Sequence, residues 1–118
     1  MSKEVTAHHD GGIMNPLISI QGSEEGAGGA CTQYLVRTEE SILASLKFQA
    51  GDPAEGINGL SNEALLAVVA DRLEGFSSGP FADNFTPRAL RYTQNALKVL
   101  RDRTADRQNR GVEGKLEK

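Results

Sequence analysis

The sequence has little of the residue types that commonly build disulfides and metal sites. It contains one cysteine, two histidines and no tryptophan among 118 residues. A single cysteine cannot form an internal disulfide bond, and we expect Cys31 to be a small buried apolar residue. His8 and His9 stand next to a glycine-containing stretch, and with one cysteine they lack the spacing of a zinc site. We therefore predict that the protein uses no metal and no cofactor.

Long apolar runs are missing as well. No run approaches the roughly 18 residues that a membrane-spanning helix needs. The N-terminus lacks the basic and then apolar pattern of a signal peptide. We expect a soluble, intracellular protein with no membrane partner. A chain of 118 residues fits one domain, but a monomer of that size buries only a moderate core. A core shared between subunits is consistent with this length.

Charge is distributed unevenly along the chain. The net charge is -3, yet residues 86–118 carry 9 Lys and Arg against 4 Asp and Glu, whereas residues 1–85 carry 4 against 12. A basic segment on an acidic protein favours an anionic ligand held locally. The same composition also fits a solvated helix, because arginine and lysine are good helix formers. Proteins that bind duplex nucleic acid are more often basic overall, so we expect no duplex partner.

The N-terminal half reads as a small antiparallel sheet. Residues 1–16 show no apolar periodicity and are predicted to be a flexible tail. Strands are predicted at 17–20, 31–37 and 41–49, the last because apolar and polar residues nearly alternate there. The glycine-rich segment 22–29 lacks the Lys-Ser/Thr ending of a phosphate-binding loop, so we interpret it as a turn. The predicted sheet spans 17–50.

The C-terminal half shows helical patterns. Ser61 is a candidate N-cap for a helix that ends at Gly75. Thr86 as N-cap and Pro87 at the first helical position open a second helix, which can continue to Arg110. Two helices joined by a short connector form an antiparallel hairpin over 61–110. The predicted fold class is therefore α+β, with one domain over 17–114 and a tail at 115–118.

Three arginines of the second helix form a candidate anion site. Arg103, Arg107 and Arg110 fall on one stripe when residues advance by about 100° around the helix axis. That stripe borders the apolar face, and guanidinium groups at such a rim can bind phosphate oxygens in pairs. The alternative is that these arginines form surface salt bridges of small energetic value. The partners would be Asp102, Asp106 and Glu113.

The connector between the helices carries two aromatic residues. Phe76 and Phe81 flank it, and an aromatic face there can stack a purine base, although core packing is the commoner role. Neither Cys31 nor the Ser77-Ser78 pair has a candidate catalytic base near it in the sequence. This pattern favours binding over catalysis.

Several motifs resemble, in order, the first family of Thoeris anti-defence proteins, which shares a helical hairpin with the second anti-CBASS sponge family. The resemblance covers about residues 31–114 and is carried by 47–51, 57–73, 76–82, Arg103-Thr104, Arg107 and 110–114. It implies a phage-encoded sponge that sequesters glycocyclic ADP-ribose in the host cytoplasm without cleaving it, and in some members also binds cyclic di- or trinucleotides. It further implies a homo-oligomer, a dimer or a hexamer, with the ligand between subunits. By this resemblance Phe76 stacks the base, and Arg103 and Arg107 bind the phosphates.

Two departures from the family pattern bear on ligand preference. Thr86 stands before Pro87 where the family usually has asparagine, so a hydroxyl replaces an amide. The loop at 51–53 is one residue shorter than is usual. We nevertheless count Thr86 among the predicted ligand-binding residues, with Phe76, Arg103, Arg107 and Arg110. Two alternatives stay open: an enzyme that degrades a cyclic nucleotide, and an interaction protein whose basic helix docks an acidic partner.

Overall fold

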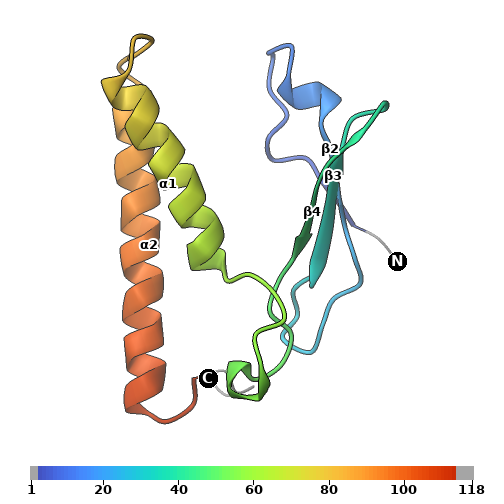
Figure 1. Ribbon diagram of the computed structural model, residues 1–118, viewed down its shortest axis with the longest axis vertical. Coiled ribbons are helices and arrows are strands. Elements are labelled where there is room, and N and C mark those ends of the chain that lie inside the picture. The colour runs from blue at the N-terminus through green and yellow to red at the C-terminus, as the bar shows by residue number, and fades with distance from the viewer. Residues whose placement is uncertain (1–2, 114–118) are drawn as a thin grey trace. The chain divides into compact units, whose positions relative to one another are not determined.

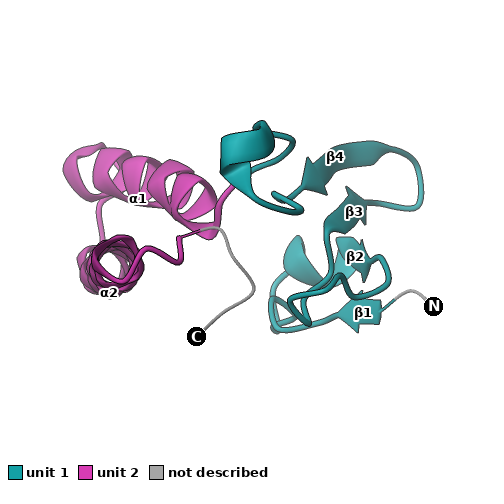
Figure 2. Cartoon of the chain, turned by 90° about the horizontal axis from the view of Figure 1, so that it is seen from below, with its two compact units in different colours: residues 1–60 teal, residues 61–118 magenta. Residues whose placement is uncertain are grey.

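The computed structural model describes residues 3–113 and has an α+β fold, as the sequence predicts (Figure 1). The chain divides into two compact units, residues 1–60 and residues 61–118 (Figure 2). The first unit contains the strands and the second contains the helices. No helix among the described residues is both long and apolar enough to cross a membrane.

The first unit is built on a four-stranded antiparallel sheet whose strands are neighbours in chain order. The strands are β1 (Lys3–Val5), β2 (Ser19–Gly22), β3 (Gln33–Arg37) and β4 (Ile42–Lys47). Two short 3-10 helices, η1 (Asn15–Leu17) and η2 (Pro53–Glu55), lie in its loops. The register aligns Ile20 with Val36 and Val36 with Ala44. The predicted antiparallel sheet is thus confirmed.

The sheet begins earlier than the sequence predicts. Strand β1 lies within the segment expected to be a flexible tail and pairs with β2, with Val5 opposite Ile20. The imidazole of His8 also donates from Nε2 to the carbonyl of Ile18, at 2.7 Å. A three-residue strand is too short to show a period of two, and main-chain pairing leaves no mark on composition. That is why the sequence did not reveal β1.

Cys31 is the one buried apolar residue of the described chain. Its sulfur lies close to Gly22: a β-carbon added there would come within 2.9 Å of Sγ, so the strand needs a glycine at this position. Beside it the rings of Tyr34 and Phe48 meet edge to face, with centroids 5.7 Å apart. The predicted burial of Cys31 is confirmed.

The second unit is an antiparallel hairpin of two helices, α1 (Asn62–Ser78) and α2 (Thr86–Asn109). Half-buried residues recur every three or four positions on both helices, as in the contact seam of a coiled coil. On α1 they include Leu66, Ala70, Leu73 and Ser77, and on α2 they include Leu90, Thr93, Leu97, Leu100 and Thr104.

The ends of α1 follow the sequence only in part. The hydroxyl of Ser61 accepts a hydrogen bond from the Ala64 amide at 3.0 Å, which confirms the predicted N-cap. The predicted stop at Gly75 is wrong, because the helix continues to Ser78 and Gly79 caps it. One glycine inside a helix costs only about 1 kcal/mol relative to alanine. A helix held by a neighbour tolerates that cost.

Candidate ligand-binding site

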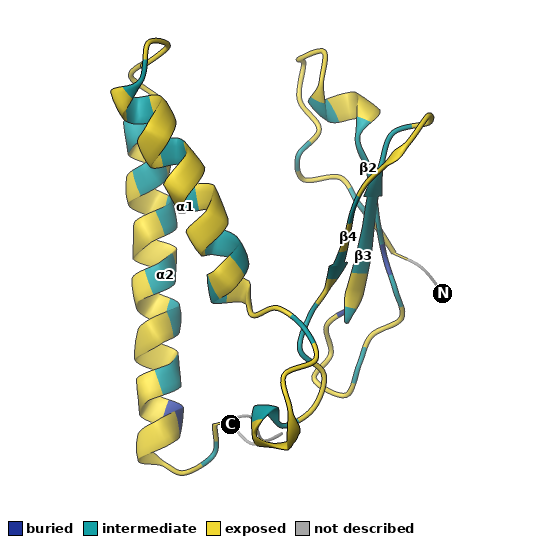
Figure 3. Ribbon diagram, in the orientation of Figure 1, coloured by how far each residue is buried: buried dark blue, intermediate teal, exposed yellow. Residues whose placement is uncertain are grey.

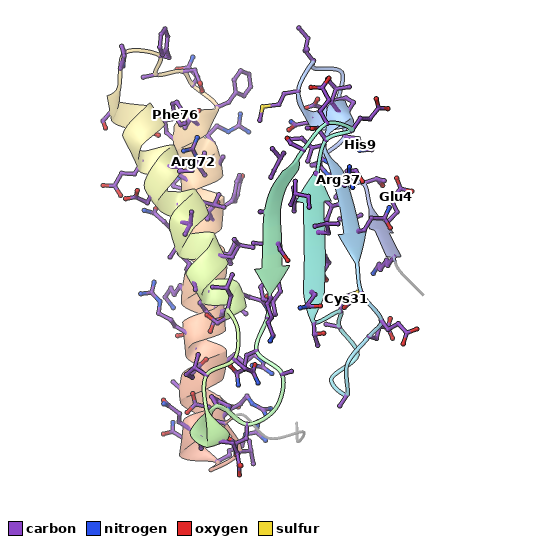
Figure 4. The ribbon with its side chains drawn as sticks, turned by 45° about the vertical axis from the view of Figure 1, so that its right-hand side comes forward. Glu4, His9, Cys31, Arg37, Arg72 and Phe76 are labelled. Carbon is purple, nitrogen blue, oxygen red and sulfur yellow. The ribbon has the colours of Figure 1, made fainter. Side chains whose placement is uncertain are left out.

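Phe76 lies on the last turn of α1 and its side chain is 49% exposed. One helical turn earlier, Arg72 places its guanidinium carbon 5.5 Å from the centroid of the Phe76 ring, a cation–π contact (Figure 4). Both side chains line an open recess of about 360 Å³ at the connector between the helices, which we call the turn recess. Its lining residues are Asp71, Arg72, Gly75, Phe76, Gly79, Pro80 and Phe81.

Thr86 is the first residue of α2 and not its cap. The cap function belongs to Asp83, whose Oδ1 accepts from the amides of Phe85 and Thr86, both at 2.7 Å. The Thr86 hydroxyl donates to Asp83 Oδ2 at 2.9 Å. The hydrogen bonds from the amide and hydroxyl of Thr86 and from Phe85 lower the pKa of Asp83 below its ordinary value. The predicted N-cap role of Thr86 is wrong because Asp83 supplies a charged acceptor to the same turn.

The three arginines near the end of α2 have different surroundings. Arg107 is only 7% exposed, and its Nη2 donates to the carbonyl of Val112 at 2.8 Å. Arg110 pairs its Nε with Asp106 Oδ2 at 3.1 Å, one of the surface salt bridges that the sequence offered as an alternative. Arg103 is exposed, and within residues 3–113 it makes no hydrogen bond or ion pair. The three arginines therefore share one stripe of the helix but differ in burial and in hydrogen-bond partners.

A tight turn after α2 fixes the position of Arg107. The Val112 amide bonds to the Arg107 carbonyl at 2.9 Å and the Gly111 amide bonds to the Gln108 carbonyl at 3.0 Å. This pair of bonds is the Schellman motif, which needs a left-handed residue at its centre. Gly111 provides it, with φ of 71°. Because Arg107 bonds to Val112 through both backbone and side chain, the turn holds the guanidinium in place.

One chain does not bring the predicted site residues together. Phe76 and Thr86 lie at the connector end of the hairpin, whereas Arg103, Arg107 and Arg110 lie at the far end of α2 (Figure 1). Thr86 and Arg103 are 17 positions apart on α2, which corresponds to roughly 25 Å along a helix axis. The predicted residues therefore fall into two separate groups within a single chain, which we call the predicted half-sites.

The comparison with known proteins identifies the family. No known family profile matches the chain. A protein of Bacillus phage SBSphiJ7 described as Thoeris anti-defense 1 is 38% identical over 105 residues, which is 88% of this chain and 73% of the relative. The chain belongs to the Thoeris anti-defense 1 family. The family resemblance drawn from the sequence motifs is confirmed.

Two features of this Thoeris anti-defence chain were missed from its sequence. Arg72 stands four residues before Phe76, and this spacing places two side chains on one face of a helix. Asp83 stands three residues before Thr86 in a connector whose geometry the sequence did not define. Among the residues that the structure describes, no cluster of three or more His, Cys, Asp or Glu is arranged to hold a metal ion.

Proposed function

We propose that this Thoeris anti-defence protein sequesters a cyclic ADP-ribose signal, glycocyclic ADP-ribose, and does not cleave it. The ligand binds in the host cytoplasm between two copies of the chain. Family membership supports the anti-defence role. The ligand class is supported by the two half-sites, one aromatic and the other rich in arginine, because a nucleotide offers a base to the first and phosphates to the second. Phe76, Thr86, Arg103, Arg107 and Arg110 are the proposed ligand-binding residues.

The observation that best supports this function is an exposed, largely apolar face on α2. Beside the seam that contacts α1, a second set of residues recurs with the same alternation of three and four positions. Figure 3 shows that much of α2 is exposed. Three large apolar side chains of this set, Phe85, Tyr92 and Val99, are 75%, 69% and 64% exposed. The full set, which we call the outer stripe, is Phe85, Ala89, Tyr92, Ala96, Val99 and Arg103.

A second copy of the chain is the occupant that this stripe fits. Contiguous exposed apolar surface on a helix commonly marks an interface, and two copies meet through the same patch when a twofold axis relates them. If the axis passes near residue 94, midway along the outer stripe, Phe85 faces the partner subunit's Arg103 and Ala89 faces the partner subunit's Val99. Tyr92 then faces the partner subunit's Ala96, so a large side chain meets a small one.

Antiparallel pairing of α2 joins the separated half-sites. It brings the basic end of one α2 to the connector end of the other hairpin, near Phe76 and Thr86. Each pair of chains then has two equivalent sites, one at each end of the interface. A guanidinium donates to phosphate oxygens in a charge-assisted pair, and Thr86, whose proton goes to Asp83, still offers lone pairs to a donor on the ligand. Further assembly of such dimers would give the hexamer.

Phosphate contacts and base stacking together can provide most of the affinity that a sponge needs. Sequestration requires free signal to fall below the threshold of its receptor, and a nanomolar dissociation constant corresponds to about -12 kcal/mol. Hydrogen bonds to charged groups contribute about 1.5–3 kcal/mol each, and base stacking on an aromatic ring about 1–3 kcal/mol. Two or three phosphate contacts and one stacked base, enclosed between two chains, supply much of this amount.

Isothermal titration calorimetry tests the proposal. We expect tight binding of glycocyclic ADP-ribose with one ligand per chain, and heat denaturation of the complex should release the ligand intact. Cyclic di- and trinucleotides form the comparison arm, since they share the base and phosphate chemistry. Absence of heat with every one of these compounds would refute the sponge function. Release of a cleaved product would instead establish the alternative of a degrading enzyme.

Docking of an acidic partner through the basic helix is the other alternative. Substituting Arg103 and Arg107 by alanine together separates it from ligand sequestration. On the proposed function the variant loses glycocyclic ADP-ribose binding and keeps its oligomeric state by light scattering. Retention of full ligand affinity by the double variant would show that these arginines serve another purpose.

A further inference from the structure

Arg72 also lines the turn recess, where it contacts the ring of Phe76. We propose that Arg72 is a positioning residue for base binding: its guanidinium covers one face of the Phe76 ring and leaves the other face for the base. This inference rests on the proposed function, because it specifies how the nucleotide enters that site. Figure 4 shows Arg72 and Phe76 as neighbours on α1.

The geometry of the pair supports a positioning role. The guanidinium carbon of Arg72 lies 5.5 Å from the Phe76 centroid, within the range of a cation–π interaction. An aromatic ring has two faces, and a cation over one of them limits the ring to the orientations that keep this contact. Phe76 is still 49% exposed, so Arg72 does not cover the ring entirely. The pair thus presents a preset stacking surface, which reduces the ordering cost of binding.

Gly75 keeps the recess open between these two side chains. It lies inside α1, where glycine is less favourable than alanine, so its presence calls for a reason. Backbone strain is not that reason, because its φ is ordinary for a helix and not positive. Packing is not the reason either, since a β-carbon at Gly75 would meet nothing within 4 Å. Gly75 lines the turn recess, and any side chain there would take up space that the base needs.

Four variants test the inference. Arg72→Met removes the charge and keeps much of the length, and Arg72→Lys keeps the charge. Gly75→Leu fills the recess with a good helix former. Arg91→Met is the matched control, because Arg91 is an exposed arginine of α2 that belongs neither to the turn recess nor to the outer stripe. The affinity of each variant for glycocyclic ADP-ribose is measured by calorimetry, and 1,N6-etheno-AMP polarisation reports base stacking separately. Inorganic pyrophosphate, which has no base, is the probe for the phosphate half of the site.

We expect Arg72→Met to weaken binding of both base-containing probes by about tenfold, with partial recovery in Arg72→Lys. Gly75→Leu should lose base binding almost completely while its melting temperature stays at or above that of the wild type. Pyrophosphate binding and the Arg91→Met variant should match the wild type. Unchanged affinity for glycocyclic ADP-ribose in Arg72→Met and Gly75→Leu overturns this inference alone. If the wild-type protein binds no glycocyclic ADP-ribose, the proposed function is overturned and the inference with it.

Discussion

Asp83 illustrates how one side chain organises the connector end of the hairpin. Its carboxylate accepts three hydrogen bonds, from the Phe85 amide and from the amide and hydroxyl of Thr86. It therefore starts α2 and also fixes the rotamer of a predicted ligand-binding residue. The sequence offered Thr86 as the cap because a threonine before proline fits that role. Composition alone could not show whether Asp83 or Thr86 caps α2, because that depends on the path of the connector between the helices.

The first prediction concerns Asp83 and pH. Its pKa is lowered in the folded protein, so its ionised form stabilises the fold. This contribution is fully present above the ordinary aspartate pKa of 3.8 and is lost as pH falls through the lower folded value. We expect Asp83→Ala to melt a few degrees below the wild type at pH 7, and the difference to shrink below pH 4. Thermal unfolding followed by circular dichroism checks this, and an equal difference at pH 7 and pH 2.5 would contradict it.

Helix α2 carries three different faces. One face contacts α1, the outer stripe is exposed and apolar except for Arg103, and a third face is polar. The third face consists of Arg88, Arg91, Asn95, Lys98 and Asp102. The helix and its approximate ends were predictable from Pro87 and from apolar periodicity, although the capping side chain is Asp83 and not Thr86. The division of its apolar residues into two seams was not, because the sequence does not say which of them α1 covers.

The second prediction tests the outer stripe. Tyr92→Glu places a charge near its centre, where the proposed twofold axis would bring two copies of the residue close together. Burial of an unpaired charge costs several kcal/mol, so we expect this variant to be monomeric. Asn95→Glu adds the same charge on the polar face and should leave the assembly intact. Light scattering coupled to size-exclusion chromatography distinguishes these outcomes, and an oligomeric Tyr92→Glu variant would show that the stripe is not the interface.

The described chain has almost no buried core of its own. Cys31 is its one buried apolar residue, while many large apolar side chains are exposed. The sequence predicted the α+β class, the antiparallel sheet and the hairpin, because these depend on local periodicity and caps. It also identified the family, because several sequence motifs occur in the family's order. The role of a single residue, such as Thr86, was harder to predict. The separation of Phe76 and Thr86 from the three arginines follows from the predicted hairpin itself. The sequence did not reveal that Arg107 is buried and bonded to Val112, since that depends on how the chain turns back after α2.

Complementation between two defective chains tests whether each ligand site is shared between two copies of the protein. Phe76→Ala and Arg103→Ala chains, co-expressed with different affinity tags, are purified as the mixed dimer and titrated with glycocyclic ADP-ribose. If each site takes its aromatic ring from one chain and its arginine from the other, the mixed dimer has one intact site and one doubly defective site. We predict near wild-type affinity with one ligand per mixed dimer, while each variant alone binds weakly. A mixed dimer that binds as poorly as either variant alone would contradict a site shared between two chains.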